Sequence, residues 1–215
     1  MKARSYVFLA VLSLGLIGAD QGTKWWAANS LAERRVERSR PACDEDGPIA
    51  RRVRYRPVRQ VDVIDGLLSL RYVENCAGAF GILSDQEESI RRPFFLAVTT
   101  AAVIFIVLLF RRLRSEQYLL KWALPFVLGG ALGNLVDRIH LRYVIDFIDM
   151  YHASIGRWPT YNVADMAIVA GVGLILLDMI PMRRTQTAPR RSTAPESSEP
   201  NHVRDASPSA GGGED

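Results

Sequence analysis

Four long apolar segments alternate with charged segments along this chain, at residues 5–26, 94–110, 118–136 and 163–180. An α-helix rises about 1.5 Å per residue and needs roughly 20 residues to cross the hydrocarbon core of a bilayer. The segments approach that length, and residues 94–110 carry no charge. The pattern therefore predicts an all-α membrane protein with four transmembrane helices.

The polar segment at residues 32–93 divides into three parts. Residues 34–59 are rich in Arg and Pro with little periodicity, which predicts a loop or an insertion. Residues 61–83 alternate apolar positions with glycines, which is typical of short strands and turns and predicts a small sheet on the membrane surface. Residues 84–92 are polar and predict a short amphipathic surface helix.

The first apolar segment has two interpretations. A basic start, a short apolar core and the small residues Ala27 and Ala28 are compatible with a cleaved signal peptide. However, Asp20 and Lys24 lie four residues apart, so on a continuing helix they share a face and can pair. Trp25 follows directly, where an aromatic anchor at the membrane interface belongs. We favour a retained transmembrane helix.

Positive charges set the expected orientation. The formal net charge is +4 and the pI about 9.3, but the basic residues flank apolar segments, which favours membrane orientation over nucleic-acid binding. Both termini are then cytoplasmic, and residues 32–93 and 137–161 lie outside. Residues 182–215 contain mainly Thr, Ser, Pro, Glu and Gly, which predicts a disordered cytoplasmic tail. The residues that define the cytoplasmic side are Lys2, Arg4, Arg111, Arg112, Arg114, Arg183 and Arg184.

In this topology a group of polar residues converges near the outer membrane surface. Ionisable groups at the edge of a bilayer are costly and persist mostly where they have a function. Spacings of three and four residues place several of them on shared helix faces. The group consists of Asp20, Lys24, Asn75, Asn134, Asp137, Arg138, Asp146, Asn162 and Asp165.

Asp146 and Asp165 are the predicted catalytic pair. Two carboxylates at one poorly hydrated site cannot both ionise cheaply, so one proton is shared between them. The ionised member can take a proton from water while the protonated member donates to a carbonyl oxygen. This chemistry needs no cofactor, and the residues do not indicate which carboxyl holds the proton.

The other polar residues have more modest interpretations. We expect Asp20 and Lys24 to form a structural pair or to contact lipid or substrate head groups. We expect Asp137 with Arg138 to form a supporting ion-pair element, and a direct part in the chemistry is the alternative. Asp149 is interpreted as a solvated interfacial charge.

The histidines and cysteines add little chemistry. His140 and His152 fit no metal-binding motif, so no metal site is predicted. Cys43 and Cys76 would both face an oxidising compartment, where a disulfide is allowed and free thiols remain an alternative.

Four motifs together resemble the lipoprotein signal peptidases, the signal peptidase II family, over about residues 5–180. They are DQGTK at 20–24, ENCAGAF at 74–80, GNLVDR at 133–138 leading into VIDF at 144–147, and YNVAD at 161–165. The glycine of the second motif comes one place later than is usual in the family, which weakens expectations for backbone contacts from that loop.

The resemblance implies a monomeric intramembrane aspartic endopeptidase of the bacterial inner membrane, within residues 1–181, with a small extracytoplasmic β-cradle. It implies catalytic roles for Asp146 and Asp165, with supporting roles for Asp20, Asn75, Asn134, Arg138 and Asn162. From the residue pattern we add Lys24 and Asp137 to the supporting set. Its substrates would be diacylglyceryl-modified prolipoproteins, cut on the N-terminal side of the lipidated cysteine, and globomycin-type lipopeptides would inhibit it.

Two other classes of protein remain as alternatives. A proton-coupled transporter would use the same carboxylates as a relay, but it predicts charges throughout the membrane depth. A non-enzymatic membrane adaptor would use the Arg-rich residues 34–59 to bind a partner.

Overall fold

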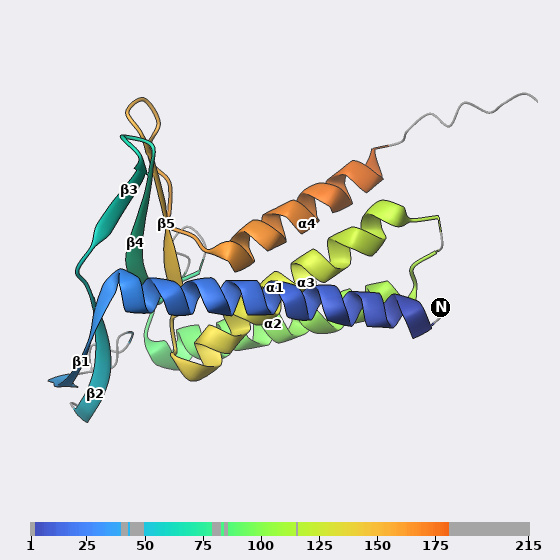
Figure 1. Cartoon of the computed structure of the whole chain (residues 1–215). Coiled ribbons are helices and arrows are strands. Elements are labelled where there is room, and N and C mark those ends of the chain that lie inside the picture. The colour runs from blue at the N-terminus through green and yellow to red at the C-terminus, as the bar shows by residue number, and fades with distance from the viewer. Residues whose placement is uncertain are drawn as a thin grey trace, which may run out of the picture. The chain divides into compact units, whose positions relative to one another are not determined.

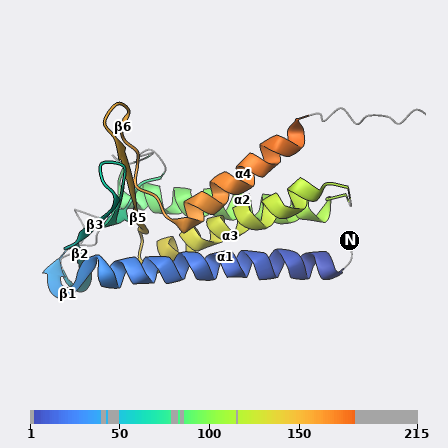
Figure 2. The ribbon, with the colours of Figure 1, turned by 45° about the horizontal axis from the view of Figure 1, so that its top comes forward.

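Four helices run alongside one another with strands gathered at one end of them (Figures 1 and 2). This is seen in a computed structural model that describes residues 3–39, 43, 50–78, 83, 86–114 and 116–180. The predicted tail at 182–215 lies outside the described residues. The helices are α1 Ala3–Ser30, α2 Glu88–Arg111, α3 Tyr118–His140 and α4 Val163–Met179.

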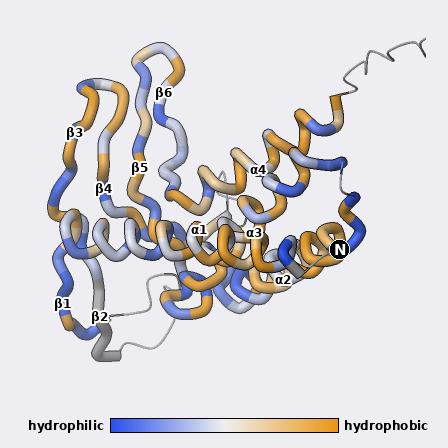
Figure 3. Tube along the Cα trace, turned by 45° about the vertical axis from the view of Figure 1, so that its right-hand side comes forward, coloured by the Kyte–Doolittle hydropathy of each residue, from blue (hydrophilic) through white to orange (hydrophobic). Residues whose placement is uncertain are grey.

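Three helices are long and apolar enough to cross a membrane by length and composition, namely Arg4–Ser30, Glu88–Arg111 and Tyr118–His140. Helix α4 is shorter, at 17 residues. Large apolar side chains such as Phe105 and Val169 are exposed on the helices, and Figure 3 shows the hydrophobic stretches that the helices carry. Exposed apolar helix surfaces are what contact with lipid requires.

A four-stranded antiparallel sheet follows the order β3-β4-β5-β6. Its strands are β3 Gln60–Ile64, β4 Leu68–Asn75, β5 Val144–His152 and β6 Gly156–Arg157. The predicted small sheet is therefore present, but it also recruits residues after α3, so a purely all-α description is wrong. Strand β5 pairs with β4 so that Asn75 lies opposite Val144 and Val73 opposite Asp146. This register joins two sequence-distant parts of the polar group.

Residues 34–39 and 50–57 of the Arg-rich segment form strands, where the composition predicted a loop or an insertion. Strands β1 Ala32–Ser39 and β2 Ala50–Pro57 pair as an antiparallel ribbon. Backbone pairing does not depend on side-chain polarity, and opposite charges on the ribbon pair directly, as in Arg56 with Glu37 at 3.2 Å. The carbonyl of Leu31 accepts from the backbone amides that follow β2, which closes the base of the ribbon.

Helix α2 begins earlier than the apolar pattern indicated. The predicted surface helix covered residues 84–92, but Glu88–Arg92 form the first turns of α2 and no separate helix is present among the described residues there. The polar side chains find partners that let the helix continue. Arg91 donates to the carbonyl of Gln86 at 3.2 Å, and Glu88 pairs with Arg142 at 3.4 Å.

Glycines let α3 approach its neighbours closely. A Cβ at Gly129 would lie 2.8 Å from the Cβ of Leu16 on α1, and one at Gly133 would lie 2.7 Å from the carboxylate of Asp20. Gly130 faces the other way, and a Cβ there would clash with the backbone carbonyl of Ala164 on α4. Helix α3 is thus the element against which both α1 and α4 position their polar residues.

Candidate active site

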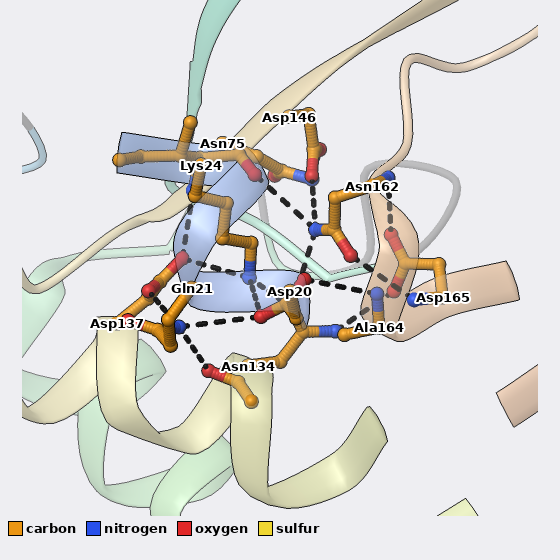
Figure 4. A network of polar contacts seen from close by, with 12 residues as sticks. Asp20, Gln21, Lys24, Asn75, Asn134, Asp137, Asp146, Asn162, Ala164 and Asp165 are labelled. Atoms are coloured by element: carbon orange, nitrogen blue, oxygen red, sulfur yellow. Dashed lines mark hydrogen bonds and ion pairs between the residues drawn. The ribbon is translucent and has the colours of Figure 1, made fainter. Parts of the chain in front are cut away.

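Eight of the nine predicted polar residues meet in one buried network, where α1, α3 and α4 reach the sheet (Figure 4). Arg138 lies beside it and is described separately below. The network draws on residues far apart in sequence, from α1, the end of β4, the last turns of α3, β5 and the first turn of α4. Its predicted members are Asp20, Lys24, Asn75, Asn134, Asp137, Asp146, Asn162 and Asp165.

Asp146 is the third residue of β5, and its side chain is almost fully buried. One carboxylate oxygen accepts from Asn75 Nδ2 at 2.8 Å and the other from Asn162 Nδ2 at 2.7 Å. Burial raises the pKa of Asp146 to about 7, and the nearby negative charge of Asp165 adds to the rise, while the two amide donors oppose it. Asp146 therefore holds its proton over part of the neutral range.

Asp165 occupies the third position of α4, in a capping box with Asn162. The Asn162 side chain accepts from the Asp165 amide at 3.0 Å, and the Asp165 carboxylate accepts from the Asn162 amide at 3.2 Å. Asn134 Nδ2 donates to the same carboxylate at 2.8 Å. These donors hold the Asp165 carboxylate in place at the first turn of α4.

Lys24 on α1 contacts two residues of α3. It is buried, and its ammonium group contacts Asp20 at 2.8 Å, Asp137 at 2.9 Å and Asn134 Oδ1 at 2.9 Å. An ammonium group has three donors, so these contacts use all of them. The predicted Asp20–Lys24 pair is present, and the Lys24 ammonium group also joins α1 to two residues of α3.

Asp20 also reaches the start of the last helix. Its second carboxylate oxygen accepts from the backbone amide of Ala164 at 2.9 Å. The first amides of a helix lack partners within the helix, and here Asp20 and Asn162 satisfy two of them. The orientation of Asp165 is therefore fixed from α1 as well as from within α4.

Asp137 positions the start of β5. Its carboxylate accepts from the Ile145 amide at 3.1 Å, next to Asp146, and from Gln21 Nε2 at 2.9 Å. Gln21 was not among the predicted residues, although it lies three positions before Lys24 and so shares its helix face. That spacing is the signal that identifies it in the sequence.

Arg138 does not form the expected ion-pair element with Asp137, which pairs with Lys24 instead. Its guanidinium lies over the ring of Phe95, 5.0 Å from the centroid. Arg138 and Phe95 line a small cleft together with Asn75, so the arginine lies beside the network. Its charge remains close enough to interact with the carboxylates of Asp146 and Asp165.

Asp149 is not a solvated interfacial charge as predicted. Its side chain is buried and accepts from Arg71 at 3.1 Å and from Ser69 at 3.4 Å, with Arg157 at 3.6 Å. Strand pairing places Ser69 directly opposite it. Sequence alone did not predict this pairing because it depends on the register of β4 and β5.

Cys43 and Cys76 form a disulfide, which selects one of the two alternatives that the sequence left open. Cys76 directly follows Asn75. Cys43 comes from the Arg-rich segment and is buried in the apolar cluster that contains Ala27 and Tyr72.

The comparisons with known proteins agree with this architecture. The family model described as Signal peptidase (SPase) II matches residues 12–181. The chain belongs to the signal peptidase II family. Among the similar members, the lipoprotein signal peptidase of Geobacter metallireducens is 45% identical over 129 residues, which cover 60% of this chain and 78% of the relative. That of Anaeromyxobacter sp. is 38% identical over 186 residues, covering 80% and 84%.

This signal peptidase II chain also shares its fold with solved structures described as bacterial membrane enzymes. One at 1.9 Å resolution aligns with a TM-score of 0.57 at 23% identity, covering 81% of this chain and 93% of the other. Another at 2.3 Å resolution gives the same TM-score and identity, covering 79% and 85%. The similarity establishes the common membrane fold.

Proposed function

We propose that this chain is an intramembrane aspartic endopeptidase that removes the signal peptide from diacylglyceryl-modified prolipoproteins, cutting on the N-terminal side of the lipidated cysteine. The observation that carries the proposal is the bridging position of Asn162, which donates to Asp146 and caps the helix turn that holds Asp165. One side chain thus links two carboxyl groups in unequal environments. The names of the family's curated members supply the substrate class.

In the proposed mechanism Asp146 is the acid and Asp165 the base. The Asp165 carboxylate takes a proton from a water molecule as its oxygen attacks the scissile carbonyl carbon, and Asp146 gives its proton to the carbonyl oxygen. The resulting gem-diol collapses when Asp165 protonates the amine and Asp146 regains a proton from a diol hydroxyl. The unequal settings of the two groups support these roles, since burial raises the pKa of Asp146 and helix-end donors surround Asp165.

The proposed topology has four spans, with α4 as the last. At about 1.5 Å per residue its 17 residues extend roughly 25 Å, and apolar side chains such as Leu176 and Met179 are exposed along it. The positive-inside rule then puts both termini in the cytoplasm and the dyad near the outer face of the bacterial inner membrane. The enzyme acts as a monomer surrounded by membrane lipids.

Substitution of each aspartate tests the proposal. Purified Asp146→Asn and Asp165→Asn are expected to lose cleavage of a lipidated prolipoprotein, measured by the mass of the released product, while keeping wild-type helix content by circular dichroism. Asp149→Asn is the matched control, because it removes a buried carboxylate from the same strand but outside the network, and it should still cleave. Normal processing by either dyad variant would exclude the assigned roles.

A further inference from the structure

Asn75 lies at the end of a strand, where backbone pairing is less firmly held than at the strand centre. Asn75 is the last residue of β4, and its pairing with Val144 is the final step of the β4–β5 ladder. Its Nδ2 donates to Asp146 at 2.8 Å, and its Oδ1 accepts from the Ala77 amide at 3.0 Å. Strand ends open more readily than strand centres, so whatever holds residues 76–78 also holds the amide that contacts Asp146.

Cys76 connects this strand end to a buried anchor. Its disulfide partner Cys43 comes from 33 residues earlier in the chain and lies within an apolar cluster that includes Ala27 and Leu31 of the α1 end. The carbonyl of Cys43 accepts a hydrogen bond from Arg91 Nη2. Arg91 is itself buried in the first turns of α2. The anchor is therefore fixed by burial, by a covalent bond and by a charged donor on a helix.

We propose that the Cys43–Cys76 disulfide is a positioning device for the active site, which holds Asn75 in the orientation that donates to Asp146. The proposal rests on the proposed function, because it assigns importance to Asn75 through Asp146. It also gives a role to the Arg-rich segment, because Cys43 lies between β1 and β2 in that segment and is bonded to Cys76. Cys76 directly follows Asn75 in the chain, so the disulfide is placed to act through Asn75.

Reduction of the disulfide is the direct test. Dithiothreitol transfers two electrons and two protons to the disulfide and becomes a cyclic disulfide itself, and maleimide labelling followed by mass measurement counts the two new thiols. The free energy of a hydrogen bond to a charged group corresponds to about a ten- to hundredfold change in an equilibrium constant, and we expect its complete loss in the transition state to lower the rate by up to that factor. A loosened Asn75 should therefore lower kcat about three- to thirtyfold, with KM changed less than about twofold.

The pH profile separates this role from general support of the fold. Donation from Asn75 lowers the pKa of Asp146, so its loss raises that pKa. Because Asp146 must be protonated to act as the acid, the high-pH limb of kcat should move to higher pH in the reduced enzyme. The variant with Cys43→Ser and Cys76→Ser should show the same profile without reductant, and reoxidation of the wild type should restore its original profile.

Asn75→Ala completes the design, because removal of the amide removes the group through which the disulfide acts. This variant should be impaired already, and reduction should change its kcat by less than about 1.5-fold, since contacts that share one path are not additive. Two results would overturn the proposal. One is an unchanged rate and pH profile in wild-type enzyme whose thiols have been counted, and the other is an equal loss on reduction in Asn75→Ala.

The failure of the proposed function would look different. Cleavage of the prolipoprotein by Asp146→Asn would refute the catalytic role of Asp146, whatever effect reduction of the disulfide has. Inactive Asp146→Asn and Asp165→Asn together with a redox-insensitive wild type would overturn only the role of the disulfide.

Discussion

The raised pKa of Asp146 predicts that the proposed acid destabilises the protein at neutral pH. The folded-state pKa is about 7, against an ordinary value of 3.8 in the unfolded chain. Between these two values the unfolded state binds fewer protons than the folded state, so the free energy of unfolding falls as pH rises. The stabilising contribution is fully present below about pH 4 and is lost as pH rises through about 7.

The size of the effect follows from the difference between the two pKa values. Each unit corresponds to about 1.4 kcal/mol, so the whole difference of about three units amounts to about 4 kcal/mol. At pH 5 about 2 kcal/mol has been lost, which leaves about 2 to 3 kcal/mol to be lost between pH 5 and pH 8. Asp146→Asn cannot ionise and should lack this part of the pH dependence, whatever constant offset the lost carboxylate contacts introduce.

Thermal unfolding in detergent, followed by circular dichroism at pH 5, 6, 7 and 8, measures this difference. The Tm of Asp146→Asn relative to wild type should rise with pH, by several degrees between pH 5 and pH 8 if about 2 to 4 °C corresponds to 1 kcal/mol. Gln60→Ala, an exposed change on β3, should keep the wild-type dependence. Parallel curves for wild type and Asp146→Asn would refute the reasoning.

Two further predictions concern the framework of the site. Lys24→Met leaves buried carboxylates without their counter-charge and should lower the free energy of unfolding by about 3 to 5 kcal/mol. The control is Lys121→Met, because the ammonium group of Lys121 lies 5.5 Å from the centroid of the Phe8 ring. This control should change the free energy of unfolding by less than about 1 kcal/mol in the same thermal assay. Gly130→Ala places a methyl group against the carbonyl of Ala164 and should cost about 1 to 3 kcal/mol and reduce cleavage. Gly173→Ala meets nothing within 4 Å and should leave both unchanged or slightly increase stability; equal effects of the two glycine changes would contradict the packing argument.

The hydrophobic pattern alone located the helices well. Each helix needs a long apolar segment of its own, and such a segment can be recognised in the sequence without knowledge of the other elements. The segments at 118–136 and 163–180 became Tyr118–His140 and Val163–Met179. The strands of the Arg-rich segment were missed because their stability comes from backbone pairing and from cross-strand ion pairs, which leave little periodic trace in the sequence. The extension of α2 back to Glu88 was missed for a related reason, since its polar residues are satisfied by partners elsewhere in the fold.

The polar group was predictable as a set because the predicted topology places its members at one depth. Its internal pairing was not, because the choice among partners depends on distances between elements. Asp137 is adjacent to Arg138 in sequence, yet it pairs with Lys24 across the interface between helices. Asp149 was misread for the same reason, since no local feature distinguishes a strand aspartate that faces two arginines from one that faces water.

The bond between Asp20 and the Ala164 amide has a consequence for the order in which the protein is made. The two residues are 144 positions apart, and synthesis at about 5 to 20 residues per second separates them by roughly 7 to 30 seconds. During that interval α1 is present while the amide that Asp20 caps, and Asp165 beside it, do not yet exist. Asp20 on the first helix therefore has no Ala164 amide to contact until the last helix is synthesised. In the proposed mechanism the nascent chain acquires its catalytic pair only when α4 packs against the other helices.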